Sequence, residues 1–202
     1  MKFRCLALLS ALLILSPELS VAQLKKAEDA KAGETKEKEK PARSAQELER
    51  IHQRNHRKAE EAWGEDKKKR SAKDFAQLET EYQEINKNYK SPNVKSLLEA
   101  FIKKWKDGNR VGCATLYLAQ KSSGPEKEKL LETCIKKFSD AYYLNGCSVG
   151  GLARLQLAAW CQQSGKASEA KKLIEEIEKS YADAEDHSNN IIGDQAAALK
   201  KK

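Results

Sequence analysis

The chain has 202 residues, of which 34% are charged and 6% aromatic, and its formal net charge is +8. This length allows one domain with a tail, and the shortage of rings excludes a core built mainly of aromatic side chains. Only 67–70 and 200–202 are undiluted basic runs, and they lack the interleaved aromatic residues of a nucleic-acid surface. The basic balance permits weak attraction to anionic polymers or membranes without requiring it.

The first 22 residues have the layout of an export signal. Lys2 and Arg4 precede an apolar run at 5–15, and the small-x-small sequence Ser-Val-Ala follows at 20–22. This pattern is typical of a cleaved secretory signal peptide, here 1–22. As a helix, the apolar run would reach about 16 Å, roughly half of the hydrocarbon thickness of a bilayer, so a membrane anchor is the less favoured alternative. We therefore expect a periplasmic or secreted protein.

Two segments of different character follow the signal. Residues 23–43 contain Lys, Glu, Ala, Gly and Thr with almost no large apolar side chain, which predicts a disordered charged linker. Ser44 and Glu47 then form a capping-box pattern that predicts the start of a helix. A thin apolar stripe indicates that this helix continues to about Trp63, before a glycine and a charged run. We expect one charged helix within 44–70.

Two further helices are predicted next. Ser71 and Asp74 repeat the capping pattern, and five apolar residues follow at spacings of three and four, which places them on one helix face. These residues are Phe75, Leu78, Tyr82, Ile85 and Tyr89. Ser91 and Pro92 then fit the N-cap and first position of the following helix. Together the two helices form a hairpin at 71–106.

An internal repeat indicates that such a hairpin is built more than once. Segments 97–107, 130–140 and 173–183 align without gaps, and each is an amphipathic helix that ends on an aromatic residue followed two positions later by Asp. A second, glycine-containing motif is shared by 107–112 and 145–150 and opens a helix rich in small residues. The chain therefore alternates a first helix, a tight turn and a second helix. The predicted hairpins are 71–106, 109–139 and 145–182.

The third hairpin resembles a tetratricopeptide repeat. With Gly165 as the turn between its helices, large and small residues fall where that family has them. They are Leu157, Ala158, Cys161, Ala170, Ile174 and Ile177. Over 71–184 the resemblance implies an all-α fold in which hairpins stack as a short tetratricopeptide-like solenoid, followed by a tail at 185–202. A helical bundle with two similar hairpins is the alternative.

Tetratricopeptide-like proteins generally hold other proteins in a concave groove formed by their first helices. The resemblance therefore implies a protein-binding groove lined from 109–122 and 147–163. Its candidate residues are Arg110, Tyr117, Gln120, Arg154 and Gln163.

Four cysteines remain once the signal is removed, and an even number in an exported chain favours disulfides. In an antiparallel hairpin that turns at Gly124, Cys113 and Cys134 stand opposite each other, and a disulfide between them would join the two helices. Cys147 and Cys161 lie about 20 Å apart along one helix and cannot pair while it is intact. A bridge between hairpins, such as Cys134 with Cys147, and buried free thiols are the alternatives.

No catalytic, cofactor or metal site is predicted. No two cysteines form a Cys-x-x-Cys motif, which argues against a thiol oxidoreductase. His52 and His56 are one helical turn apart, but three neighbouring arginines would repel a cation. The glycines within 146–151 follow no strand and precede no Gly-Lys-Ser/Thr sequence, so close helix packing explains them better than phosphate binding. No pattern supplies a nucleophile with its base, so we do not expect an enzyme.

These observations favour an exported, non-catalytic scaffold or adaptor for protein-protein interaction, whose partner is another envelope or extracellular protein. The alternative is a binder of anionic envelope polymer or lipid headgroups that uses 67–70 and the C-terminal basic run. Neither function needs a cofactor or nucleic acid, and membrane contact would be peripheral at most. We expect a monomer or a small homo-oligomer.

Overall fold

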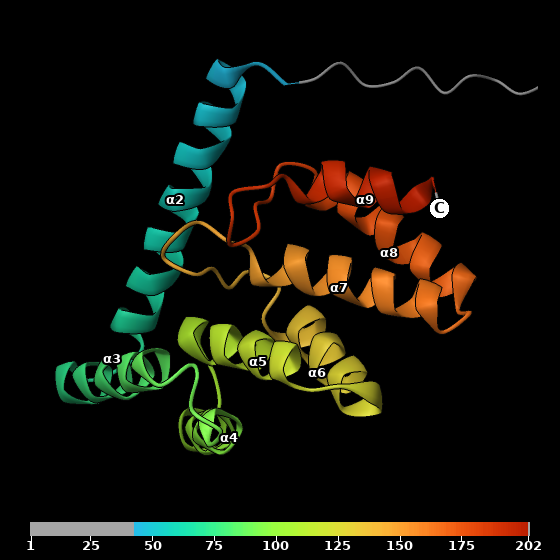
Figure 1. Cartoon of the computed structure of the whole chain (residues 1–202). Helices are drawn as coiled ribbons and strands as arrows, with labels where there is room; N and C mark the ends of the chain where they lie inside the picture. Colours follow the sequence, from blue (N-terminus) through green and yellow to red (C-terminus); the bar gives the residue numbers. More distant parts are fainter. Residues whose placement is uncertain (1–42, 202) are drawn as a thin grey trace, which may run out of the picture. The chain divides into compact units, whose positions relative to one another are not determined.

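The structure, a computed structural model, describes residues 43–201 (Figure 1). The predicted signal peptide and the predicted linker up to residue 42 lie outside the described residues. Between 43 and 201 the protein is all-α, with eight helices and three isolated β-bridges. The helices are α2 (Ala45–Lys68), α3 (Ala72–Lys87), α4 (Val94–Trp105), α5 (Asn109–Lys121), α6 (Gly124–Lys137), α7 (Val149–Gln163), α8 (Ala167–Ser180) and α9 (Ile192–Lys200). None of the helices in this range is long and apolar enough to span a bilayer.

Helix α2 begins where the sequence predicts and ends later. The Ser44 hydroxyl accepts a hydrogen bond of 3.1 Å from the backbone N–H three residues on, which confirms the predicted N-cap. The helix continues through Gly64 instead of stopping near Trp63. A glycine inside a helix costs only about 1 kcal/mol relative to alanine. Asp66, two residues further on, is buried and accepts a hydrogen bond from the Arg110 N–H.

Helix α3 buries the apolar face that its spacing predicts. Ser71 caps it by accepting a hydrogen bond of 3.1 Å from the Asp74 N–H. The buried residues are Phe75, Leu78, Tyr82 and Ile85. Tyr89, expected on the same face, lies past the end of α3 and is 50% exposed. Helix α4 begins at Val94, slightly later than the serine-proline pair suggests.

Helices that follow one another along the chain pack side by side. Contacts join α3 to α4, α5 to α6 and α7 to α8, which are the three predicted hairpins, and also join each hairpin to the next helix. Helices α5 and α7 are the most buried, and their glycine, alanine and cysteine residues allow neighbouring backbones to approach closely. The core therefore lies along these two helices, with α4, α6 and α8 around them.

The third hairpin packs as its sequence predicts. Its six expected packing positions are all buried: Leu157, Ala158, Cys161, Ala170, Ile174 and Ile177. The turn between its helices contains Gly165 at φ +74°, a left-handed conformation that glycine adopts without steric cost. The predicted burial and the predicted turn are both confirmed.

Three loops, which we call corners, join the end of each second helix to the start of the next helix. They are the first corner (105–109), the second corner (138–149) and the third corner (181–192). The second and third corners share a backbone structure at an offset of 43 residues. The Val149 N–H donates to the Ala141 carbonyl at 2.9 Å, and the Ile192 N–H donates to the Ala184 carbonyl at 2.8 Å. The repeat therefore extends past residue 184.

The segment 185–202, predicted to be a tail, instead completes the third corner and forms helix α9. This helix packs on α7 and α8 and buries Ile192 and Ala196. The glycine motif of the second corner is not recognisable in the sequence of the third corner, because Asn189 stands at the position of Gly146. Both residues have positive φ, +62° and +86° respectively. Asparagine tolerates this region better than other non-glycine residues, so the turn survives the exchange.

Between residues 43 and 201 the predicted disulfides are absent. The four cysteines of this range, Cys113, Cys134, Cys147 and Cys161, are buried free thiols. The Cys113 thiol donates to the Tyr142 carbonyl in the second corner at 3.4 Å, so it faces the corner and not a cysteine of α6. Burial raises the pKa of Cys113 and that of Cys134 to about 12. Such thiols pack as small apolar side chains. The structure therefore has the buried free thiols that the sequence allowed as an alternative to disulfides.

Candidate protein-binding furrow

Helix α2 lies against the hairpin corners (Figure 1). At the first corner, a Cβ on Gly108 (φ +98°) would lie 2.0 Å from the Asp66 carboxylate. At the second corner, a Cβ on Gly146 (φ +86°) would already touch the His56 backbone nitrogen at 3.4 Å. Each glycine thus combines a left-handed turn with a close approach to α2. The glycine motif was interpreted from the sequence as a packing feature. It forms the surface on which α2 packs, which we call the seat of α2.

Asp66 fixes one end of α2 at the start of α5. Its side chain is 1% exposed and accepts a hydrogen bond of 3.1 Å from the Arg110 N–H. Helix α5 follows a glycine and has no capping side chain of its own, so the Asp66 carboxylate serves as its cap. Burial raises the pKa of this carboxyl, although the Arg110 N–H and the Arg70 guanidinium oppose the rise.

Two of the predicted groove residues, Arg110 and Arg154, are engaged inside the protein. The Arg110 side chain is 3% exposed, binds Glu79 through two hydrogen bonds of 2.6 and 2.7 Å, and lies 4.8 Å over the Tyr82 ring. Arg154 lies 4.6 Å over the Tyr181 ring and binds a carboxylate of α8 at 2.8 Å. These bidentate and cation–π contacts hold neighbouring helices together.

The other three predicted groove residues lie apart from these arginines. Tyr117 is half-buried and donates its hydroxyl to the Tyr89 carbonyl at 3.4 Å. Gln120 and Gln163 are exposed at the ends of α5 and α7. The structure does not gather the five residues on one open face, because α5 is covered by α2, α3, α4, α6 and α7.

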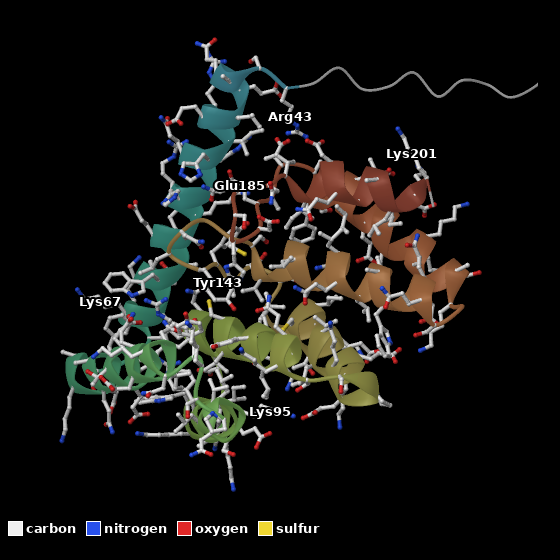
Figure 2. All side chains as sticks on the ribbon, in the orientation of Figure 1. Arg43, Lys67, Lys95, Tyr143, Glu185 and Lys201 are labelled. Atoms are coloured by element: carbon white, nitrogen blue, oxygen red, sulfur yellow. The ribbon has the colours of Figure 1, made fainter. Side chains whose placement is uncertain are left out.

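The other end of α2 is fixed at the third corner. Glu185 is 2% exposed and accepts a hydrogen bond of 3.1 Å from the Asn55 amide, while His52 Nδ1 lies 3.3 Å from its second oxygen (Figure 2). Arg43, just before the helix, binds Asp183 at 2.6 Å. A buried carboxylate needs such partners, so this cluster holds α2 in one position.

A furrow runs along one flank of α2 between these two anchors. It consists of hollows of about 790 and 220 Å³, and Lys58 and Tyr142 belong to the walls of both. One wall is a stripe of α2 residues: Arg54, Lys58, Glu61, Glu65 and Lys69. The opposite wall is made of residues from 106–109, 137–142 and 179–184, at or next to the three corners. We call this feature the α2 furrow.

The α2 furrow contains charged side chains that the fold does not use. Four lysines in its walls have no ion pair and no hydrogen bond to other residues between 43 and 201. They are Lys58 on α2, Lys69 at the C-terminal cap of α2, and Lys106 and Lys137 on the opposite wall. The carboxylates of Glu61 and Asp140 are likewise unpaired within this range. The furrow therefore offers six charges to a ligand, four of them positive.

The α2 furrow presents ammonium and carboxylate groups along one elongated hollow. In residues 43–201, no three His, Cys, Asp or Glu side chains are grouped so that they could hold a metal ion. Comparison with protein-family models, with curated proteins and with solved structures finds no match. The chemistry of the furrow is therefore the basis on which a function can be assigned.

Some residues of the furrow could have been recognised from the sequence, because they recur in the internal repeat. The aspartates that close the three aligned repeat segments, Asp107, Asp140 and Asp183, all line the furrow. An acidic residue just past the end of an amphipathic helix does not favour that helix, because it adds negative charge at the negative end of the dipole. Its recurrence therefore indicates a shared contact. Arginines on or next to helix α2 provide that contact for two of the aspartates, Arg70 for Asp107 and Arg54 for Asp183, whereas Asp140 has no ion pair within residues 43–201.

Proposed function

We propose that this protein is a non-catalytic helical-repeat scaffold that binds another protein in the α2 furrow. The observation that carries the proposal is a hollow of about 790 Å³ with six charged side chains that have no ion pair and no hydrogen bond to other residues between 43 and 201. Both of its walls are anchored by buried contacts, so a ligand would meet a preformed surface. Preformed surfaces bind more tightly because less conformational entropy is lost on association.

The arrangement of the hairpins supports a repeat scaffold in particular. Each corner contributes to the same furrow, so the binding surface grows with the number of stacked hairpins, as in short solenoids. The predicted signal peptide supports export. We therefore expect the partner to be an envelope or extracellular protein in the periplasm or outside the cell.

The proposal can be tested by photo-crosslinking in the native compartment. A benzoylphenylalanine residue is placed at position 58 in the furrow or, as a matched control, at position 172 on the exposed surface of α8. We expect position 58 to form a covalent adduct with one defined protein, identified by mass spectrometry, and position 172 to form none with that protein. Equal adducts at both positions, or none at position 58, would contradict the proposal.

The unpaired lysines support a second candidate, a binder of anionic envelope polymer. The basic run Lys67–Arg70 adds to this positive charge, although Lys68 and Arg70 are paired with Glu65 and Asp107. Salt separates the two functions, because binding to an anionic polymer releases counterions and weakens steeply between about 50 and 200 mM salt. A protein complex in the furrow should persist over this range. Retention on an immobilised anionic polysaccharide at the higher salt concentration, with no protein adduct, would favour neither candidate.

A further inference from the structure

The first corner of the repeat binds an arginine of the chain itself. Arg70 donates to the Asp107 carboxylate at 3.1 Å and to the Asp107 carbonyl at 2.6 Å. Its guanidinium lies 5.7 Å from the centre of the Trp105 ring. The aromatic residue and the aspartate two positions later, which recur in all three repeat segments, together form this arginine site.

The third corner binds arginine with the same kinds of group. Arg43 donates to the Asp183 carboxylate at 2.6 Å and to the Ala182 carbonyl at 3.3 Å. Arg54 reaches the second carboxylate oxygen of Asp183 at 3.1 Å. The aromatic residue of this corner, Tyr181, lies beneath a third guanidinium at 4.6 Å. Two of the three equivalent aspartates are thus occupied by arginines.

The second corner has the same two residues, Phe138 and Asp140, without an arginine. Asp140 is exposed, and neither an ion pair nor a cation over Phe138 occurs within the described part of the chain. Both residues line the larger hollow of the α2 furrow. Glu61, the other unpaired carboxylate, belongs to the facing stripe of α2. The aspartate of this corner is therefore open at the middle of the furrow, whereas its aromatic residue, Phe138, is buried.

We propose that the second corner is the arginine-binding subsite of the α2 furrow, which takes a guanidinium from the partner protein. This inference rests on the proposed function and names the chemistry of its ligand. A guanidinium is favoured over an ammonium, because its planar fork can donate to a carboxylate and a neighbouring carbonyl at the same time, as at Asp107.

The surroundings of the subsite restrict the partner further. Lys58, Lys69, Lys106 and Lys137 line the same hollow and would repel a uniformly basic segment. The partner segment therefore carries carboxylates on both sides of its arginine, which pair with these lysines while the guanidinium reaches Asp140. The volume of about 790 Å³ leaves room for several residues of such a segment.

The test is selection from a random dodecapeptide display library against the full mature chain and its variants. Asp140→Asn removes the subsite charge, and Lys58→Gln changes the furrow outside the subsite. Glu132→Gln, on the exposed face of α6, is the matched control for loss of a carboxylate. On the unaltered chain we expect enriched peptides with one arginine between acidic residues, and the same peptides on Glu132→Gln. On Asp140→Asn the arginine should no longer be enriched.

Titration of the best peptide gives the quantitative readout. We expect Asp140→Asn to weaken its binding at least about tenfold and to leave the affinity of the matching peptide with glutamine in place of arginine unchanged. Enriched peptides without arginine that still depend on Lys58 would overturn the subsite and leave the furrow function standing. If no peptide is enriched on the unaltered chain, both proposals fail.

Discussion

Two stripes of helix α2 differ in what surrounds them. The inner stripe, Ile51, Asn55, Ala59 and Asp66, is buried. Its two polar side chains are hydrogen-bonded, Asn55 to the third corner and Asp66 to the start of α5. The furrow stripe next to it carries Lys58, Glu61 and Lys69, which form no ion pair and no hydrogen bond between residues 43 and 201. One charged helix thus combines a structural face with a face available for binding. The contrast predicts that substitutions on the two stripes separate stability from recognition.

The largest effect is expected at the seat of the inner stripe. Gly108→Ala would place a methyl group 2.0 Å from the Asp66 carboxylate at a residue with φ +98°. Strain and displacement of α2 should lower the free energy of unfolding by about 2 to 4 kcal/mol, measured by urea denaturation. Gly64→Ala is the matched control, because its methyl group meets no atom within 4 Å. The control should raise the free energy of unfolding by up to about 1 kcal/mol. Equal losses of unfolding free energy in both variants would contradict the close packing of Gly108 against α2.

A smaller effect is expected at the cap that Asp66 supplies. Asp66→Ala leaves the first turn of α5 without an acceptor, which should cost about 1 to 2 kcal/mol of unfolding free energy. The pH dependence gives a further check. Because burial raises the pKa of Asp66 in the folded protein, this carboxyl takes up a proton there before it does in the unfolded chain.

The sign of this pH effect can be read against Asp66→Asn, which does not titrate. As the pH falls from neutral through the raised pKa of Asp66, the original protein should gain stability relative to the variant. The gain is absent at neutral pH, where the carboxyl is ionised in both states, and complete below its unfolded pKa. Denaturation curves at a series of pH values measure the difference. A difference that moves in the opposite direction would show that the carboxyl is not desolvated.

The smallest effect on stability is expected on the furrow stripe. Lys58→Gln combined with Lys69→Gln removes two exposed charges that form no ion pair and no hydrogen bond within residues 43–201. The free energy of unfolding should change by less than about 0.5 kcal/mol. The adduct formed from a photo-crosslinker at position 61 should nevertheless be strongly reduced. A loss of unfolding free energy comparable to that of Gly108→Ala would show that these lysines stabilise the fold, which would contradict the prediction.

The local structure of this protein could be predicted from its sequence. Ser44 and Ser71 predicted two helix starts, because a capping hydroxyl and its N–H partner are three residues apart. The spacing of apolar residues predicted the buried face of α3 and the packing positions of the third hairpin. The repeat predicted three hairpins, and they are present. Each of these signals is carried by residues close to one another along the chain.

Only the tertiary structure decided how α2 is used and where a ligand could bind. Its inner stripe is half polar, so hydrophobic periodicity could not identify it, and its partners lie far away in sequence. Asp66 meets a backbone group 44 residues on, and Asn55 meets a carboxylate 130 residues on. A polar side chain is stable inside only when such a partner is in place, and no local pattern reports that. For the same reason, the sequence could not show that the four cysteines between residues 43 and 201 pack as free thiols.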